Sequence, residues 1–184
     1  MSETDPSPNG VKTVAAVAAL IASAALAIMP FTISREGMIQ QAYVDPIGKW
    51  TICAGHTEGV KPGQHATISE CKKYYVKDMT KAMMYVAKTT PRTLENFNAL
   101  KASGDFVFNA PGWWVGSPMA LHFSKGEWKE GCNSFSGYIV NGSFNRAQPR
   151  MECTRKGSGR GYWCKLPGLV AAREKERAIC LGEE

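Results

Sequence analysis

The sequence contains no Cys-x-x-Cys pair, although six of its 184 residues are cysteine. No cysteine therefore has the spacing of a typical zinc site, and we expect neither a metal nor a cofactor. The chain is basic, with 22 lysines and arginines against 16 acidic residues and a net charge of +6. It is not arginine-rich in the manner of a nucleic-acid binder, so no nucleic-acid partner is expected. An anionic polymer suits such a charge, although a merely soluble basic protein fits it equally well.

Charge is also absent from residues 13–34, which separate a polar tail from the rest of the chain. Residues 1–12 lack an apolar run, which predicts a disordered, cytoplasmic tail. The 22 uncharged residues that follow are long enough to cross a bilayer core of about 30 Å. Eight of them are strongly apolar and eight are alanine. The strongly apolar residues contribute about −4 kcal/mol, so we expect only a marginal membrane helix.

Three interpretations of residues 13–34 remain open. Ala22-Ser-Ala24 and Ala25-Leu-Ala27 resemble small-residue cleavage sites, so the segment could be a cleaved signal peptide. It could also be a permanent anchor or a buried core helix. The third interpretation is a signal anchor that is inserted first and released later. Lys12 is offset by nearby acids and Arg35 lies on the far side, so charge encodes the orientation poorly.

Two carboxylates and a hydroxyl follow this segment at a spacing that glycosidic hydrolysis could use. Glu36 and Asp45 are separated by eight residues, and Thr51 follows after five more. One carboxyl must donate a proton to the leaving oxygen, with a pKa raised to about 6 by an apolar setting that the preceding segment could give Glu36. Asp45 would stay ionised and hold a water or stabilise positive charge on the sugar, and Thr51 could hold the attacking water. The same positions have explanations without catalysis: Glu36 could be a membrane-flanking charge, Asp45 a turn former and Thr51 a strand residue.

The local pattern predicts how the two acids are brought together. Residues 38–43 contain no helix breaker and would continue a helix that begins near Ser34. Residues 45–48, Asp-Pro-Ile-Gly, predict a turn, and residues 50–53 predict a strand. Glu36 at a helix end would then face the hairpin across a cleft.

Glu36, Asp45 and Thr51 resemble the Glu, Asp/Cys, Thr triad of the phage lysozymes, glycoside hydrolase family 24. Gly55-His56-Thr57 resembles the Gly-His signature of that family. Further matches follow in order to the end of the chain: Phe106-Val-Phe-Asn109, the segment from Ser117 to Trp128, Leu166-Pro-Gly-Leu169, and Arg173 to Cys180. With the apolar segment in front, the chain is most similar to the signal-anchor-release (SAR) endolysins of phages.

The resemblance implies a lysozyme-like α+β fold that is mostly helical. Residues 35–184 would form the muramidase domain, behind a signal-anchor helix at residues 13–34. A small β-hairpin lobe is expected near residues 43–66, then a long helix and a helical C-terminal lobe, with the cleft between the lobes. The capping box Thr67-Ile-Ser-Glu70 independently predicts where the long helix starts.

Later segments predict further helices, and the chain departs from the family pattern at Ala110 to Trp114, in the basic segment and at Ala172. Pro91 opens a helix with an expected bend at Ser103-Gly104, and further helices are expected from Ser117, over residues 127–138 and from Pro167. Residues 142–165 depart from the pattern, because six basic residues with one opposing glutamate predict a long basic loop. This loop could contact anionic glycan or membrane lipid, or simply be solvated.

Several further residues are candidates for the site or its support. By the resemblance, His56 pairs with Asp78 on the long helix in a structural role. Asn109 lies where the family carries a polar residue near the cleft, although a helix-end asparagine explains it as well. Trp113 and Trp114 could stack on a saccharide if their rings are exposed, and otherwise belong to the core.

The even number of cysteines favours disulfides in a chain bound for the periplasm. Composition alone leaves 15 full pairings. Two pairs recur together in the relatives that the chain resembles, and the third is economical because both cysteines lie in the basic loop: Cys53–Cys71, Cys132–Cys180 and Cys153–Cys164. Position 45 is aspartate and the apolar segment has no cysteine. The thiol-exchange activation of some SAR endolysins is therefore not expected.

The resemblance implies a peptidoglycan muramidase that hydrolyses the β-1,4 bond between N-acetylmuramic acid and N-acetylglucosamine, by inversion with a water next to Asp45. As a phage endolysin for host cell lysis, it would be a monomer, held inactive in the host inner membrane with its N-terminus inside. It would act in the periplasm after release. A lytic transglycosylase, which needs only the glutamate, is the alternative enzyme. An inactive membrane-tethered wall-binding protein is the alternative from another class.

Overall fold

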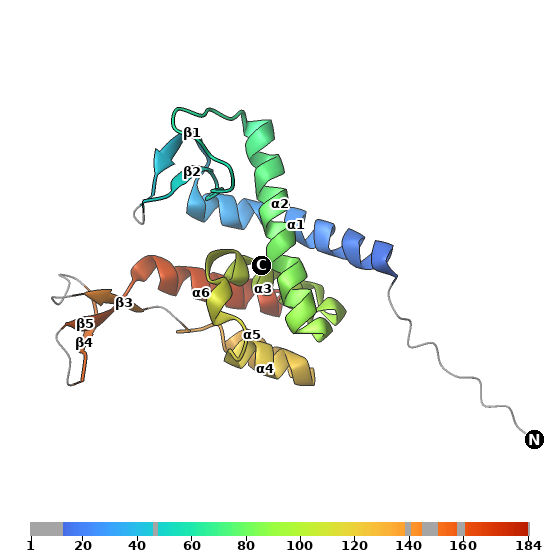
Figure 1. The fold of residues 1–184 in the computed structure, drawn as a ribbon. Helices are drawn as coiled ribbons and strands as arrows, with labels where there is room; N and C mark the ends of the chain where they lie inside the picture. The colour runs from blue at the N-terminus through green and yellow to red at the C-terminus, as the bar shows by residue number, and fades with distance from the viewer. Residues whose placement is uncertain (1–12, 46–47, 139–140, 145–150, 158–160, 184) are drawn as a thin grey trace, which may run out of the picture.

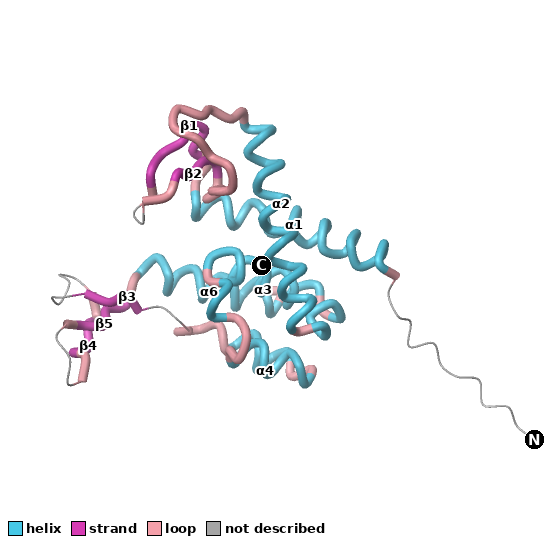
Figure 2. The backbone as a smooth tube through the Cα atoms, in the orientation of Figure 1, coloured by secondary structure: helices cyan, strands magenta, loops and turns pink. Residues whose placement is uncertain are grey.

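The computed structural model describes residues 13–45, 48–138, 141–144, 151–157 and 161–183. The predicted tail at residues 1–12 lies outside these residues, as do Arg146, Arg150 and Arg160 of the basic segment. The described chain is mostly helical, with a two-stranded and a three-stranded antiparallel sheet. Figures 1 and 2 show one small sheet above the helical body and the other projecting from it to the left.

The apolar segment forms a single helix, α1 (Val14–Glu36), which starts where the Thr13 side chain accepts a hydrogen bond from the Ala16 N–H. It is long and apolar enough to cross a membrane. One of its faces packs against the body and buries Ile21, Ala24, Ala25 and Ile28. The helix continues through Pro30 to Glu36. The apolar segment and the first candidate catalytic residue therefore share one helix.

The predicted helix over residues 38–43 is wrong. Gly37 adopts a φ of 77° and donates its N–H to Ile33 O, which closes α1. This left-handed conformation is accessible to glycine without a steric penalty. The chain then enters β1 (Ile39–Val44), which pairs with β2 (Trp50–Cys53). The predicted strand at residues 50–53 is confirmed, and the hairpin lobe begins at Ile39 rather than near residue 43.

The long helix α2 (Ile68–Thr89) links the hairpin lobe to the helical lobe, as Figure 1 shows. The predicted capping box is confirmed, since the Thr67 side chain accepts from the Glu70 N–H and the Glu70 side chain accepts from the Thr67 N–H. The disulfide Cys53–Cys71 ties β2 to the first turn of α2.

The helical lobe is organised around α3, which packs against α1, α2 and α6. Its core includes Leu100, Phe106, Phe123 and Phe135, all fully buried. The disulfide Cys132–Cys180 ties α5 to α6. The elements of this lobe are η1 (Pro91–Glu95), α3 (Phe97–Asn109), η2 (Pro111–Trp113), α4 (Pro118–Lys125), α5 (Trp128–Asn133) and α6 (Pro167–Leu181).

Two predictions in this lobe are wrong. Ser103-Gly104 does not bend the chain, because α3 is continuous from Phe97 to Asn109. A Cβ at Gly104 would lie 2.6 Å from Met83 Cγ on α2, so this glycine allows two helices to approach closely. The helix expected over residues 127–138 is α5, which ends at Asn133.

The described parts of the basic segment include three strands of a small sheet, where a loop was predicted. Its strands are β3 (Asn141–Phe144), β4 (Cys153–Arg155) and β5 (Tyr162–Lys165), in the order β3-β5-β4. The disulfide Cys153–Cys164 joins directly opposed residues of β4 and β5. All three expected disulfides are thus present. Figure 2 shows this sheet extending away from the helical body, beyond the start of α6.

Candidate active site

Glu36 is the last residue of α1, and its side chain is 29% exposed. Arg35 Nε donates a hydrogen bond to Glu36 Oε1 at 2.9 Å. The expected apolar setting for Glu36 is therefore not what the structure shows, because a guanidinium contacts its carboxylate. Glu36 lines a cavity of about 350 Å³ together with Asn109, Leu169 and Arg173.

Arg35 connects Glu36 to a carboxylate in the core. Arg35 Nη1 donates to Asp105 Oδ2 at 2.7 Å, and Asp105 is fully buried on α3. The hydroxyl of Thr32, one turn earlier on α1, donates to Asp105 Oδ1 at 2.6 Å. Tyr75 OH donates to Thr32 Oγ1 at 3.2 Å. Both oxygens of Asp105 thus accept hydrogen bonds from the last turns of α1.

A second buried ion pair lies beside Asp105. Arg173 and Glu176 of α6 are 2% and 0% exposed and form an ion pair, and Arg35 Nη1 is 3.6 Å from Glu176 Oε1. Burial raises the pKa of Glu176 well above its usual value and outweighs the opposing effect of Arg173. For Arg35, burial lowers the pKa, but the charges of Asp105, Glu36 and Glu176 outweigh burial and leave the pKa raised.

Asp45 and Thr51 come together at the turn end of the hairpin. Thr51 Oγ1 lies 3.4 Å from Asp45 Oδ2 and 3.2 Å from Lys49 O, and Asp45 Oδ1 accepts from the Lys49 N–H at 2.8 Å. Thr51 is 3% exposed, whereas Asp45 is partly exposed. The Asp45 carboxylate and the Thr51 hydroxyl therefore lie next to each other.

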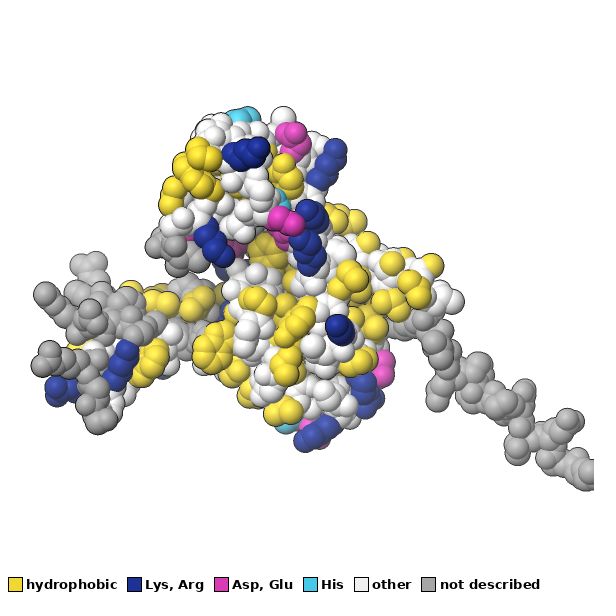
Figure 3. Space-filling view, viewed as in Figure 1, with side chains coloured by type: hydrophobic (Ala, Val, Ile, Leu, Met, Phe, Trp, Pro, Cys, Tyr) yellow, Lys and Arg dark blue, Asp and Glu magenta, His cyan; other side chains and the backbone are white. Residues whose placement is uncertain are grey.

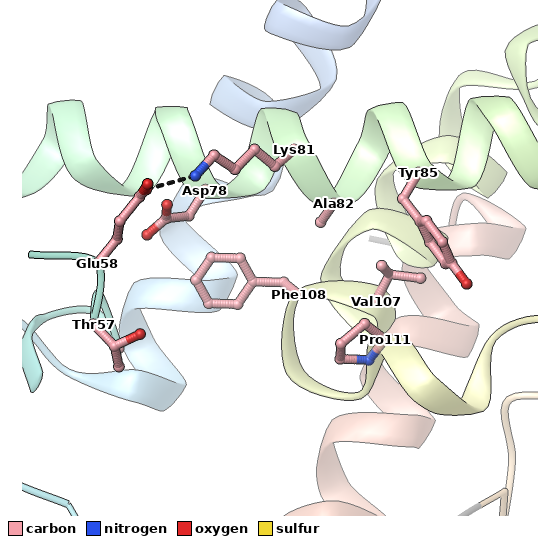
Figure 4. Close-up of a pocket in the computed structure, with 10 residues that line it drawn as sticks. Thr57, Glu58, Asp78, Lys81, Ala82, Tyr85, Val107, Phe108 and Pro111 are labelled. Atoms are coloured by element: carbon pink, nitrogen blue, oxygen red, sulfur yellow. Dashed lines mark hydrogen bonds and ion pairs between the residues drawn. The ribbon is translucent and has the colours of Figure 1, made fainter. Parts of the chain in front are cut away.

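Two further cavities extend from the Glu36 cavity along the helical lobe. Asn109, Leu169 and Arg173 also line a second cavity of about 350 Å³, which includes Trp113. Pro111 is common to that cavity and to one of about 480 Å³ that reaches the hairpin lobe. Figure 4 shows the largest of these three, with the Glu58–Lys81 ion pair near one end and Tyr85 near the other. Neighbouring cavities share lining residues, and we call the surface that the three line the depression.

The candidates for sugar binding divide between this depression and the core. Asn109 is exposed and donates to Asp105 O at 3.0 Å, so it is a helix-end residue that also lines the depression. Trp113 is 57% exposed and lines the depression. The prediction that Trp114 could bind sugar is wrong, because Trp114 is fully buried and donates its indole N–H to Thr89 Oγ1. It belongs to the core and cannot stack on a sugar.

His56 and Asp78 are paired as expected from the resemblance. His56 Nδ1 lies 2.6 Å from Asp78 Oδ2, and the imidazole stacks on Tyr74 with ring centroids 4.3 Å apart. The histidine is 4% exposed. These contacts join the hairpin lobe to α2.

Sequence reasoning missed Arg35, Asp105 and Glu176 as residues of the site. One signal could have indicated Asp105, since it is the only charged residue between Lys101 and Lys125. An acidic residue in such an apolar helix has to find a partner when it is buried.

The chain is similar to several SAR-endolysins. It is 27% identical over 179 residues to the SAR-endolysin of Enterobacteria phage P21, a match that covers 90% of this chain and 93% of the relative. It is 32% identical over 104 residues to the SAR-endolysin of Pseudomonas phage phiKMV, which covers 56% of this chain and 64% of that protein.

The structure is similar to the crystal structure of the active form of the P1 phage endolysin Lyz. The TM-score is 0.64 at 23% sequence identity, and the match covers 95% of this chain and 97% of that chain. The lysozyme-like α+β fold is thereby confirmed. The phage lysozyme family model matches residues 33–176, from the last turn of α1 into α6. Because this match spans well over half of the sequence, the chain belongs to the phage lysozyme family and is a lysozyme.

Proposed function

We propose that Glu36 is the general acid of this phage lysozyme and that Asp45 and Thr51 hold the attacking water. The bond cleaved is the β-1,4 link between N-acetylmuramic acid and N-acetylglucosamine in peptidoglycan. The observation that carries the proposal is the placement of Glu36 at the end of α1, where it lines the depression and accepts a hydrogen bond from Arg35. The hairpin that follows directly holds Asp45 next to Thr51.

The proposed residues divide the chemistry between them. Glu36 gives its proton to the leaving glycosidic oxygen as the bond to the anomeric carbon breaks. Asp45 takes a proton from the water that Thr51 helps to position, and the water oxygen bonds to the anomeric carbon from the opposite face. The products are two glycan ends with the configuration inverted at the new reducing end. No step in this sequence uses a cofactor.

The depression is the proposed glycan-binding cleft. Three neighbouring cavities that share lining residues offer the extended site that a polymeric substrate needs. Trp113 offers an exposed aromatic ring and Asn109 an exposed amide along it. Aromatic rings with a few polar groups are the usual lining of such sites.

The membrane would control the activity of the enzyme, because residues of the site belong to the helix that spans it. Thr32, Arg35 and Glu36 all belong to α1. While α1 spans the host inner membrane with its N-terminus inside, these residues cannot reach Asp105 or the cleft. Release of α1 and its packing on the body assemble the site, so the enzyme acts in the periplasm only after release. We expect the active form to be a monomer.

A lytic transglycosylase is the alternative within enzymes. It would need Glu36 but not the Asp45–Thr51 cluster, so the contact between these two side chains favours hydrolysis. Digested peptidoglycan should contain new reducing ends. A product with 1,6-anhydro ends would identify the transglycosylase instead.

The central test is a turbidity assay on outer-membrane-permeabilised cells with Glu36→Gln beside the wild type. The substitution preserves shape and removes the acidic proton, so activity should fall by at least about 100-fold. Glu130→Gln, at an exposed position of α5, is the matched control and should retain full activity. Retention of more than about a tenth of the wild-type rate in Glu36→Gln would refute the assignment. Failure of the wild type itself to lyse cells would instead identify an inactive wall-binding protein.

A further inference from the structure

The outer face of α1 remains uncovered when the helix is packed on the body. Only 22% of its most apolar 18-residue stretch is buried. Val14 and Leu26 are 88% and 57% exposed. Figure 3 shows hydrophobic atoms gathered on the end of α1 that projects from the body. A folded, soluble form of this protein thus carries an extended apolar surface, of the kind that marks interaction sites.

A groove with a basic rim lies beside this surface. Leu26 and Met29 of α1 and Val76 of α2 form the apolar part of a cavity of about 650 Å³. Three lysines of α2 line the same cavity: Lys72, Lys73 and Lys77. Lys77 is paired with Glu58 at 3.0 Å. Lys72 and Lys73 are exposed and adjacent in the second turn of α2.

We propose that this surface, formed by the outer face of α1 and by Lys72 and Lys73, binds an anionic phospholipid bilayer while α1 stays packed on the body. The lysines would meet lipid phosphates, and Val14 and Leu26 would enter the boundary between headgroups and acyl chains. Surface-bound helices combine an apolar face with lysines at its edge in this way. Basic residues close to an anionic leaflet add attraction at each position.

A bilayer fits this surface better than a protein partner. None of the exposed residues of α1 within the described chain is aromatic, and none is charged. Most are alanines, which offer few of the large side chains that anchor protein interfaces. The binding goes beyond the proposed function, because it concerns the enzyme after α1 has packed on the body and requires no catalysis. It would keep the released enzyme at the membrane surface.

The test uses the purified full-length protein and two kinds of vesicle, one of phosphatidylcholine alone and one that also contains phosphatidylglycerol. We expect co-sedimentation with the anionic vesicles only. The bound protein should be released in about 1 M salt, where charges are screened beyond about 3 Å. The released protein should lyse permeabilised cells at the rate of protein that never met a vesicle, since α1 never left the body.

Matched variants separate this surface from general charge. Lys72→Gln with Lys73→Gln should lower the vesicle partition coefficient by roughly 25-fold, at about a factor of five for each lysine. Lys125→Gln with Lys129→Gln makes the same charge change at exposed positions of the helical lobe and should leave binding within about twofold. Leu26→Ser should weaken binding several-fold, whereas Leu121→Ser, at a position 54% exposed, should not.

Three results would overturn the inference. The first is no binding to anionic vesicles, and the second is an equal loss of binding in both lysine pairs. The third is binding that resists salt and ignores Lys72 and Lys73, because this would mean that α1 has left the body and reinserted. Failure of the proposed catalytic function gives a different pattern, in which vesicle binding is intact but the wild-type protein does not cleave peptidoglycan.

Discussion

Arg35 Nη1 lies 2.7 Å from Asp105 Oδ2, although the two residues are 70 positions apart in the chain. The same guanidinium holds Glu36 through its Nε. Asp105 is fully buried, so its carboxylate needs hydrogen-bond partners, and α1 supplies them. Removing one partner of a buried pair typically costs about 3–5 kcal/mol, a sizeable part of the roughly 5–15 kcal/mol by which most proteins are stable. Packing of α1 and placement of the proposed general acid are thereby coupled.

Asp105→Asn tests this coupling. The amide keeps the size of the side chain and an acceptor for Thr32, but it removes the charge that fixes Arg35. We expect kcat to fall about tenfold with KM nearly unchanged, because Glu36 loses orientation and the cleft does not change. Arg35→Lys should act similarly, since an ammonium cannot contact Asp105 and Glu36 with a planar fork. In the double variant, kcat should fall by a factor much smaller than the product of the two single-variant factors. Multiplicative losses would show that the two residues act separately.

The stability of the protein should depend on pH through Glu176. Burial raises its pKa well above the usual value, so the folded protein binds this proton more tightly than the unfolded chain does. The resulting stability is present below the unfolded pKa of about 4.5 and is lost as the pH rises through the folded value. Glu176→Gln removes this titration. Its free energy of unfolding should therefore improve relative to the wild type as the pH rises from about 4 to about 8.

Glu58 supplies the control of opposite sign for that measurement. Hydrogen bonds from Lys81 and Lys77 lower its pKa to about 2. Its stabilisation is present above the unfolded pKa and is lost as the pH falls towards 2, and it is small because the group is exposed. In thermal unfolding, the melting temperature of the wild type relative to that of Glu58→Gln should rise as the pH rises. If the stability of both variants relative to wild type changed in the same direction with pH, the result would argue against the buried environment of Glu176.

The disulfides should differ in what they stabilise. Cys132–Cys180 closes a separation of 48 residues between α5 and α6, whereas Cys153–Cys164 closes 11 within the small outlying sheet. Alanine at Cys132 and Cys180 should lower the free energy of unfolding by about 4 kcal/mol in denaturant titrations. Alanine at Cys153 and Cys164 should leave the unfolding of the helical body unchanged. Peptide mapping without reductant should recover the three pairs, and a Cys153 bridged outside its sheet would contradict the assignment.

The exposed face of α1 provides a test of release. Four alanines there, Ala15, Ala18, Ala19 and Ala22, are exposed, so leucine at these positions leaves the buried contacts of α1 intact. The change should add about 2 kcal/mol of membrane preference, roughly thirtyfold in partition. We expect the variant to stay in the membrane fraction and to lyse cells late or not at all. Serine at the same four positions is the control and should favour the soluble form. Wild-type partition and lysis in the leucine variant would show a cleaved signal or a fixed anchor instead.

Features that depend on neighbours within a few residues were predictable from the sequence. Thr67 and Glu70 form the predicted capping box because both of its hydrogen bonds lie within one helical turn. The strand predicted at residues 50–53 is likewise present as β2. Glu36 was correctly expected at a helix end, but for the wrong reason, since the conformation of Gly37 ends α1 and starts a strand.

The sequence by itself determined the uncharged length of α1 and the order of the acid, carboxylate and hydroxyl, because these are properties of adjacent or nearly adjacent residues. The tertiary structure alone decided which long-range partners complete the site. Asp105 meets Arg35 only because α3 packs across α1. Trp113 is exposed and Trp114 buried because η2 presents one ring to the depression and the other to Phe106 and Phe123. No local pattern distinguishes two adjacent tryptophans, since the difference arises from how distant helices surround them.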